Sequence, residues 1–126
     1  MARSDRTVTA LRALAVAFND SAGELAGLAD RAERLARELE SGSSLADALA
    51  RESRPLMVTR LTQLGDLLTD AGAEVRRAEA HQLREEGLTQ EGIAELFGVS
   101  RQRVAALLKP RAPGARGPYR PAPPRA

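Results

Sequence analysis

Apolar residues recur at alternating spacings of three and four throughout residues 6–40 of the chain. The run has one polar member and comprises Leu11, Leu14, Phe18, Ser21, Leu25, Leu28, Ala32, Leu35 and Leu39. Residues at this spacing lie on one face of an α-helix and form the seam of a coiled coil. We therefore expect a helix over residues 6–40. Residues 19–21 could alternatively divide it into two helices, with Asp20 or Ser21 as the N-cap.

A second run with the same spacing follows a short helical segment at about residues 44–52. Its members are Met57, Leu61, Leu64, Leu68, Ala71, Val75 and Ala78. Because proline is tolerated in the first turn of a helix, we expect this helix to begin at Pro55. Gly72 is its weak point and sets the expected end of an N-terminal helical oligomerisation region, residues 1–72.

The two seams need partners for their apolar faces. They can pack against each other as a helical hairpin, or against a second copy of the chain. Both seams are long for a monomer of 126 residues. We therefore expect a homodimer that uses both of them.

The composition indicates an all-α fold and excludes several kinds of site. The chain is 43% hydrophobic but only 2% aromatic, so Leu, Ala and Val must build the core. Strands prefer β-branched and aromatic runs, which are nearly absent. There is no cysteine and one histidine, His81, which we expect to be exposed or packed between helices. A disulfide framework, a cysteine nucleophile and a thiolate metal site are therefore excluded, and we expect no cofactor and no metal.

Positive charge is concentrated in the last quarter of the chain. Residues 1–99 hold 12 Lys or Arg and 17 Asp or Glu, whereas residues 100–126 hold 7 Lys or Arg and no acid. Such a basic segment attracts a polyanion or simply solubilises the chain. Residues 110–126 are also rich in proline and glycine, which predicts a flexible, extended basic tail.

The segment from Thr89 to Lys109 reads as two short helices joined by a tight turn. Thr89 and Ser100 can cap the two helices. Gly98 follows the end of the first helix, where a left-handed backbone is expected. The inward-facing residues at helical spacing are Ile93, Ala94, Phe97, Val104, Leu107 and Leu108, with Val99 as a buried plug in the turn. Gly92 departs from a capping box, which would place Glu or Gln there.

This segment resembles the helix-turn-helix of bacterial regulators, especially the versions in site-specific invertases, resolvases and sigma factors. The resemblance implies a third helix over about residues 73–86, with Val75, Ala80 and Leu83 in its core. It also implies a DNA-binding domain over residues 73–109, a homeodomain-like three-helix bundle.

The resemblance further implies that the second helix of the motif enters the major groove of double-stranded DNA. Gln102 can then pair with adenine and Arg101 with guanine, each through two hydrogen bonds. Alanines 105 and 106 can approach a thymine methyl group. The full set expected at the DNA is Ser100, Arg101, Gln102, Arg103, Ala105, Ala106, Lys109, Arg111 and Arg116, with Ser100, Arg103, Lys109 and the tail arginines at phosphates.

Three functions remain open for such a chain. The first is a dimeric, sequence-specific transcription regulator. The second is an architectural protein of the nucleoid that relies on the tail, and the third is an adaptor whose N-terminal helices bind another protein. An enzyme is not expected, because no acid, base and nucleophile converge and the recombinase catalytic domain has no counterpart here. We expect a cytoplasmic, nucleoid-associated protein from a high-GC bacterium, with no membrane segment.

Overall fold

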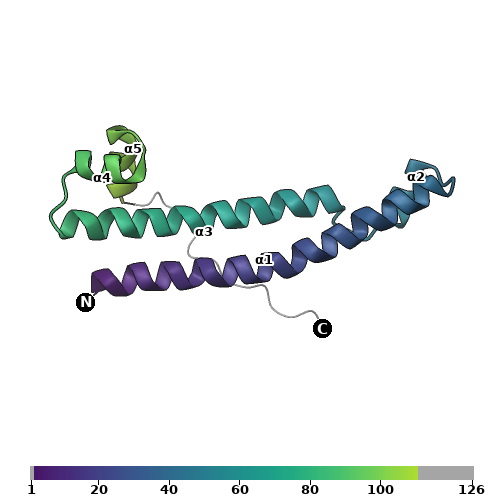
Figure 1. The fold of residues 1–126 in the computed structure, drawn as a ribbon, viewed down its shortest axis with the longest axis horizontal. Coiled ribbons are helices and arrows are strands. Elements are labelled where there is room, and N and C mark those ends of the chain that lie inside the picture. Colours follow the sequence, from purple (N-terminus) through teal and green to yellow (C-terminus); the bar gives the residue numbers. More distant parts are fainter. Residues whose placement is uncertain (1, 111–126) are drawn as a thin grey trace.

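The computed structural model describes residues 2–110, with side chains from residue 5, and this part of the chain is helical with no strand. Its elements are α1 (Ala2–Glu40), α2 (Leu45–Arg51), α3 (Met57–Glu85), α4 (Gln90–Phe97) and α5 (Arg101–Leu108). Helices α1 and α3 run side by side, α2 lies at one end of this pair, and α4 and α5 lie on α3 at the other end (Figure 1). Among the described residues, no helix is long and apolar enough to cross a membrane.

Helix α1 is continuous. It passes through residues 19–21 without a break, so the alternative of two helices is wrong. Ser21 does not cap a helix but is buried at 4% exposure on the face that packs against α3. Small side chains dominate this contact, because Ala10 and Ala17 of α1 and Ala71 and Ala78 of α3 are all buried. Small residues at the contact allow two helices to approach closely.

Only half of the predicted α1 seam faces α3. Leu14 packs against the core formed by Ala10, Val75 and Ala78, and Leu28 is buried. The alternate seam members point outward instead: Leu11, Phe18, Leu25 and Leu39 are all at least 40% exposed. The second seam is also incomplete, because its member Leu61 is 51% exposed. The apolar surface of the hairpin is therefore wider than the contact between its own two helices.

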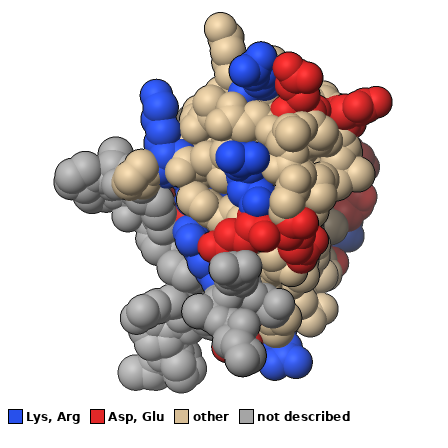
Figure 2. All heavy atoms as spheres, turned by 90° about the vertical axis from the view of Figure 1, so that its left-hand side faces the viewer, with Lys and Arg blue, Asp and Glu red and all other residues tan. Residues whose placement is uncertain are grey.

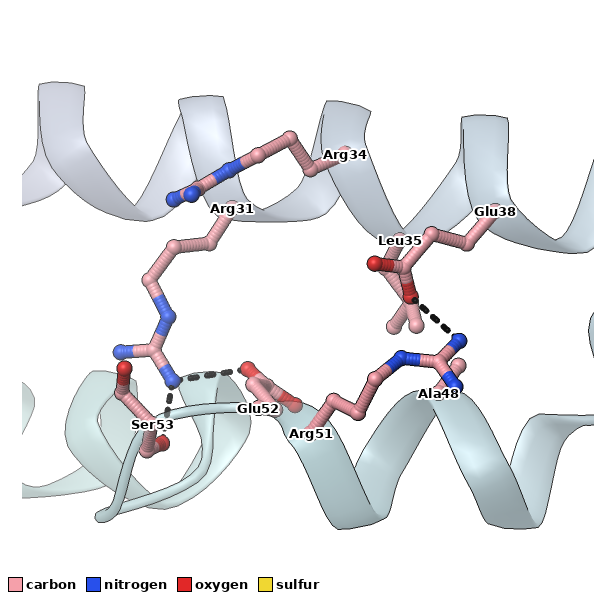
Figure 3. A pocket seen from close by; sticks show the side chains of 8 residues that line it. All are labelled: Arg31, Arg34, Leu35, Glu38, Ala48, Arg51, Glu52 and Ser53. Carbon is pink, nitrogen blue, oxygen red and sulfur yellow. Dashed lines mark hydrogen bonds and ion pairs between the residues drawn. The ribbon is translucent and has the colours of Figure 1, made fainter.

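The connection from α1 to α3 is held by a charged clamp. Ser44 caps α2 by accepting a hydrogen bond from the Asp47 amide. Arg31 Nη2 of α1 lies 2.8 Å from Glu52 Oε1 (Figure 3). The same carboxylate oxygen accepts a hydrogen bond from the Met57 amide at 3.0 Å. Both charged side chains are mostly buried. The clamp therefore holds the first residue of α3, which is Met57. The prediction that this helix begins at Pro55 is wrong.

Replacing Glu52 by glutamine is expected to destabilise the fold by about 1 to 2 kcal/mol, because the mostly buried Arg31 loses its charged acceptor. Glu38→Gln is the matched control, since its 3.8 Å pair with Arg51 is about half exposed. That change is expected to cost less than about 0.5 kcal/mol. Urea unfolding of both variants measures the difference, and equal midpoints would contradict a structural role for the clamp.

Helix α3 continues unbroken through Gly72, so the expected boundary between residues 72 and 73 lies inside one helix. Its C-terminal part supports two packing contacts. Val75 belongs to the cluster with Ala10 and Ala78, not to the core beneath α4 and α5 as predicted. Leu83 does contribute to that second core. One long helix thus connects the hairpin to the C-terminal helices.

Candidate nucleic-acid interface

Helices α4 and α5 are joined by the three residues Gly98, Val99 and Ser100. Thr89 accepts a hydrogen bond from the Gly92 amide at 3.0 Å, and Ser100 accepts one from the Arg103 amide at 3.0 Å. Each hydroxyl therefore caps its helix as predicted. The missing capping-box side chain at Gly92 does not prevent the Thr89 cap.

Gly98 ends α4 with a left-handed backbone, φ 67° and ψ 35°. The next amide, of Val99, donates to the Ala94 carbonyl at 3.0 Å, and the Gly98 amide donates to Glu95. This is the Schellman pattern, which satisfies the last carbonyls of a helix. The same pattern ends α3, where Gly87 has φ +104° and the Leu88 amide donates to the Leu83 carbonyl. Both sharp turns of the unit therefore begin at a glycine.

Replacing Gly98 by alanine is expected to cost about 1 to 2 kcal/mol, the penalty for an L-residue in the left-handed region. No other atom lies within 4 Å of the added Cβ, so the cost is one of backbone conformation alone. Gly27→Ala is the control, at an open position within α1, and is expected to stabilise the chain by roughly 0.5 to 1 kcal/mol. Thermal unfolding of the two variants should move in opposite directions.

A compact core fixes α5 relative to α4. Ile93 and Val104 are fully buried. With Ala94 they form a cluster against which Leu83, Leu88, Phe97 and Leu108 pack. Leu107 is also buried, as predicted. The prediction that Val99 is buried in the turn is wrong, because this residue is 38% exposed.

Two arginines of α3 brace this unit, and the sequence analysis did not identify either of them. Arg77 Nη1 donates to the Leu107 carbonyl at 3.1 Å and lies 3.3 Å from the Lys109 carbonyl, so it binds the C-terminal end of α5. The Arg76 guanidinium stacks over the Phe97 ring, 4.1 Å from its centroid. Arg77 therefore stabilises the C-terminal end of α5, and Arg76 stabilises the position of the Phe97 ring. Without α3, α4 and α5 would lack both contacts. The available signal was the adjacent pair Arg76 and Arg77, the only two consecutive basic residues in α3.

The residues predicted to contact DNA lie largely on one exposed face of α5. Arg101, Gln102, Arg103, Ala106 and Lys109 are exposed, while Val104 and Leu107 on the opposite face are buried. Ala105 is partly buried. Ser100 uses its oxygen as the cap, which leaves its O–H group available as a donor. The predicted contacts Arg111 and Arg116 lie outside the described residues.

The charge of this surface is mixed. Arg101 Nη1 lies 3.2 Å from Glu91 Oε1 of α4, with both side chains more than two-thirds exposed. Residues 73–109 contain six Lys or Arg and six Asp or Glu, so the unit carries no net charge. Figure 2 views the end of the molecule that carries α4 and α5 and shows basic groups interspersed with acidic ones. Any attraction to a polyanion must therefore come from local placement on α5 and from the basic residues that follow it.

The histidine of α3 lies close to this unit. His81 is partly buried, and its pKa is lowered below 6.5, first by burial and then by the nearby Arg6 and Arg77, while Glu85 opposes the shift. This fits a histidine packed between helices. Within the described residues, no three His, Asp or Glu side chains are grouped so that they could hold a metal ion.

Comparison with known proteins gives no further guide. No protein-family model matches the chain, and neither the curated proteins nor the solved structures contain a significant match. The assignment of function therefore depends on the residues and geometry described above.

Proposed function

We propose that the chain is a sequence-specific, DNA-binding regulator of transcription that acts as a dimer on the nucleoid. In this proposal α4 and α5 are a helix-turn-helix, and α5 is the recognition helix that enters the major groove of double-stranded DNA. The observation that carries the proposal is the division of α5 into two faces. Its buried face holds Val104 and Leu107, its exposed surface presents Arg101, Gln102 and Arg103, and Lys109 is its C-cap.

The side chains on that exposed face suit base recognition. Arg101 and Gln102 stand at the N-terminal end of α5, which is the end that meets base edges in this type of motif. The Arg101 guanidinium fits the two acceptors of guanine, and the Gln102 amide fits the donor and acceptor of adenine. Arg103, on the flank of that face, and Lys109, at the C-cap of α5, suit phosphate oxygens.

A second function is favoured by the charge distribution. Since residues 73–109 are neutral overall, an architectural protein that binds many sites through the basic residues after Lys109 is the alternative. A third, an adaptor that binds another protein, is favoured by the exposed apolar face of the hairpin. The three differ in how strongly DNA sequence affects binding.

Selection of bound fragments from random genomic DNA, followed by sequencing, tests the proposal. A specific dimeric regulator is expected to enrich one motif with two half-sites. A very short motif at thousands of places, with binding that requires residues 110–126, would instead support the architectural function. Absence of enrichment at low salt would contradict both DNA-binding functions and support the adaptor.

A further inference from the structure

An unbroken apolar stripe runs along the outer face of α1. From residue 8 to residue 39, every position at the alternating spacing of three and four is apolar and exposed. The large members are Val8, Leu11, Phe18, Leu25 and Leu39, and alanine occupies positions 15, 22, 29, 32 and 36. We call these ten residues the outer seam. Each of its positions follows by one residue a position on the face that packs against α3. An apolar heptad stripe of this kind normally packs against another helix.

The outer seam continues onto α3. Arg60 Nε lies 2.6 Å from Glu24 Oε2, so positions 24 and 60 face each other across the hairpin. Leu25 and Leu61 each follow these positions by one residue. Because α1 and α3 are antiparallel, one step along each helix rotates both side chains toward the same side of the hairpin. Val58, which is 65% exposed, lies one turn from Leu61 on that side.

The size of this apolar surface suits a protein partner of matching shape. At 1.5 Å per residue the outer seam is about 47 Å long, and on a helix roughly 10 Å wide it offers on the order of 470 Å². The apolar residues of α3 bring this closer to the roughly 800 Å² per partner of a standard interface. A second copy of the chain presents an equally long surface.

We propose that a second copy covers the outer seam, with the two α1 helices antiparallel and the two-fold axis between residues 23 and 24. The outer seam holds five large residues and five alanines, and three of the alanines are consecutive members at positions 29, 32 and 36. In the antiparallel arrangement Phe18 therefore faces Ala29 of the other copy, and Leu11 faces Ala36. A parallel pair would place Phe18 against Phe18 and leave consecutive alanine layers poorly filled.

One pair of opposite charges favours the same arrangement, although the same edge also brings Asp5 near Glu40 of the other copy. Arg12 and Glu33 flank the outer seam on the same edge, three heptads apart, and neither forms an ion pair within the described part of the chain. In the antiparallel register Arg12 lies on the same edge as Glu33 of the second copy, offset from it by two residues, or about 3 Å, along the helix axes. By symmetry the pair forms twice. A parallel pair would place Arg12 near the uncharged Thr7 and Glu33 near Leu28.

This arrangement separates the two recognition helices. Both copies of α3 lie on the same side of the α1 pair, because the two-fold axis is perpendicular to the plane of those helices. Arg77 binds α5 to α3, and the Thr7 hydroxyl lies 3.5 Å from the neighbouring Ala78 carbonyl. Residue 7 is about 25 Å from the axis, so the two α5 helices are about 50 Å apart, beyond the roughly 34–36 Å of one DNA turn. The comparison with the DNA turn depends on the proposed DNA-binding function, whereas the proposed interface between the two copies does not.

Single-cysteine variants of the full chain test the interface without DNA, since the native chain contains no cysteine. In the proposed dimer, residue 11 lies beside residue 36 of the other copy but about 37 Å from its own counterpart. A mixture of Leu11→Cys and Ala36→Cys, oxidised with glutathione disulfide, is expected to form the mixed dimer, because a disulfide needs Cα atoms within about 7 Å. Each variant alone is expected to stay uncross-linked.

Every other outcome contradicts the proposal. Cross-linking of each variant with itself would show a parallel pair, and a monomer in sedimentation experiments would exclude the dimer. A dimer without the mixed disulfide would place the interface elsewhere. As a second measurement, Arg12→Glu and Glu33→Arg are each expected to weaken dimerisation about tenfold, and the double variant to restore it.

Discussion

Replacing Arg101 and Gln102 together by alanine is expected to lower affinity for the selected two-half-site DNA by at least about 100-fold. Each two-bond contact with a base contributes about 1 to 3 kcal/mol of discrimination, and a dimer makes each contact twice. Affinity for random DNA should change much less, because most of that affinity comes from phosphate contacts. Fluorescence anisotropy with labelled specific and random duplexes measures both quantities.

Two further variants of the same surface serve as controls for this result. Arg103→Ala, which removes an expected phosphate contact, should weaken all sequences equally and reduce the dependence on salt. Glu91→Gln frees Arg101 from its 3.2 Å ion pair and should tighten binding. All the replaced side chains are exposed, so the fold should be preserved and unchanged circular dichroism is expected. An equal loss of specific and random binding in the double variant would exclude Arg101 and Gln102 as base contacts.

Replacing Phe18 by glutamate is expected to convert the dimer into a folded monomer and to reduce affinity for the two-half-site DNA by about 100-fold or more. Phe18 is 55% exposed in one copy, so the charge is tolerated there. At the proposed interface the same carboxylate would be buried against Ala29 of the other copy without a partner. The monomer loses the gain in affinity for DNA that comes from joining two binding units, and this gain is typically about 10² to 10⁴-fold.

The DNA itself provides the internal control for this variant. Binding to a single half-site should be unchanged in Phe18→Glu, because the substitution is remote from α5. Thr9→Glu introduces the same charge at an exposed position outside the outer seam, and should leave both the dimer and the binding intact. Sedimentation and anisotropy measured together decide the matter. A monomer that still binds the full site tightly, or a best half-site spacing of one DNA turn, would contradict the proposed arrangement.

Much of the local structure followed from the sequence, because it depends on interactions between near neighbours in the chain. Thr89 and Ser100 cap α4 and α5 by accepting hydrogen bonds from nearby backbone amides, and Gly98 takes the left-handed conformation at the end of α4. The alternating spacing likewise indicated helices over almost the full lengths observed. Helix boundaries that depended on one residue were less reliable, as the start of α3 at Met57 shows.

What the sequence could not determine is which side of each helix would be buried. Two stripes of similar hydrophobicity lie next to each other on α1, namely the face that packs against α3 and the outer seam. The predicted seam contained alternate residues from these two stripes. The choice was made by the fit with α3, where Ala10, Ala17 and Ser21 allow close packing and the bulkier Leu11 and Phe18 remain outside. The support of α5 by Arg77 and the pairing of Arg101 with Glu91 are also tertiary, because each joins residues on different helices. Spacing within the chain therefore specifies helices and their caps, whereas shape and charge complementarity between helices decide which faces pack and which remain available to partners.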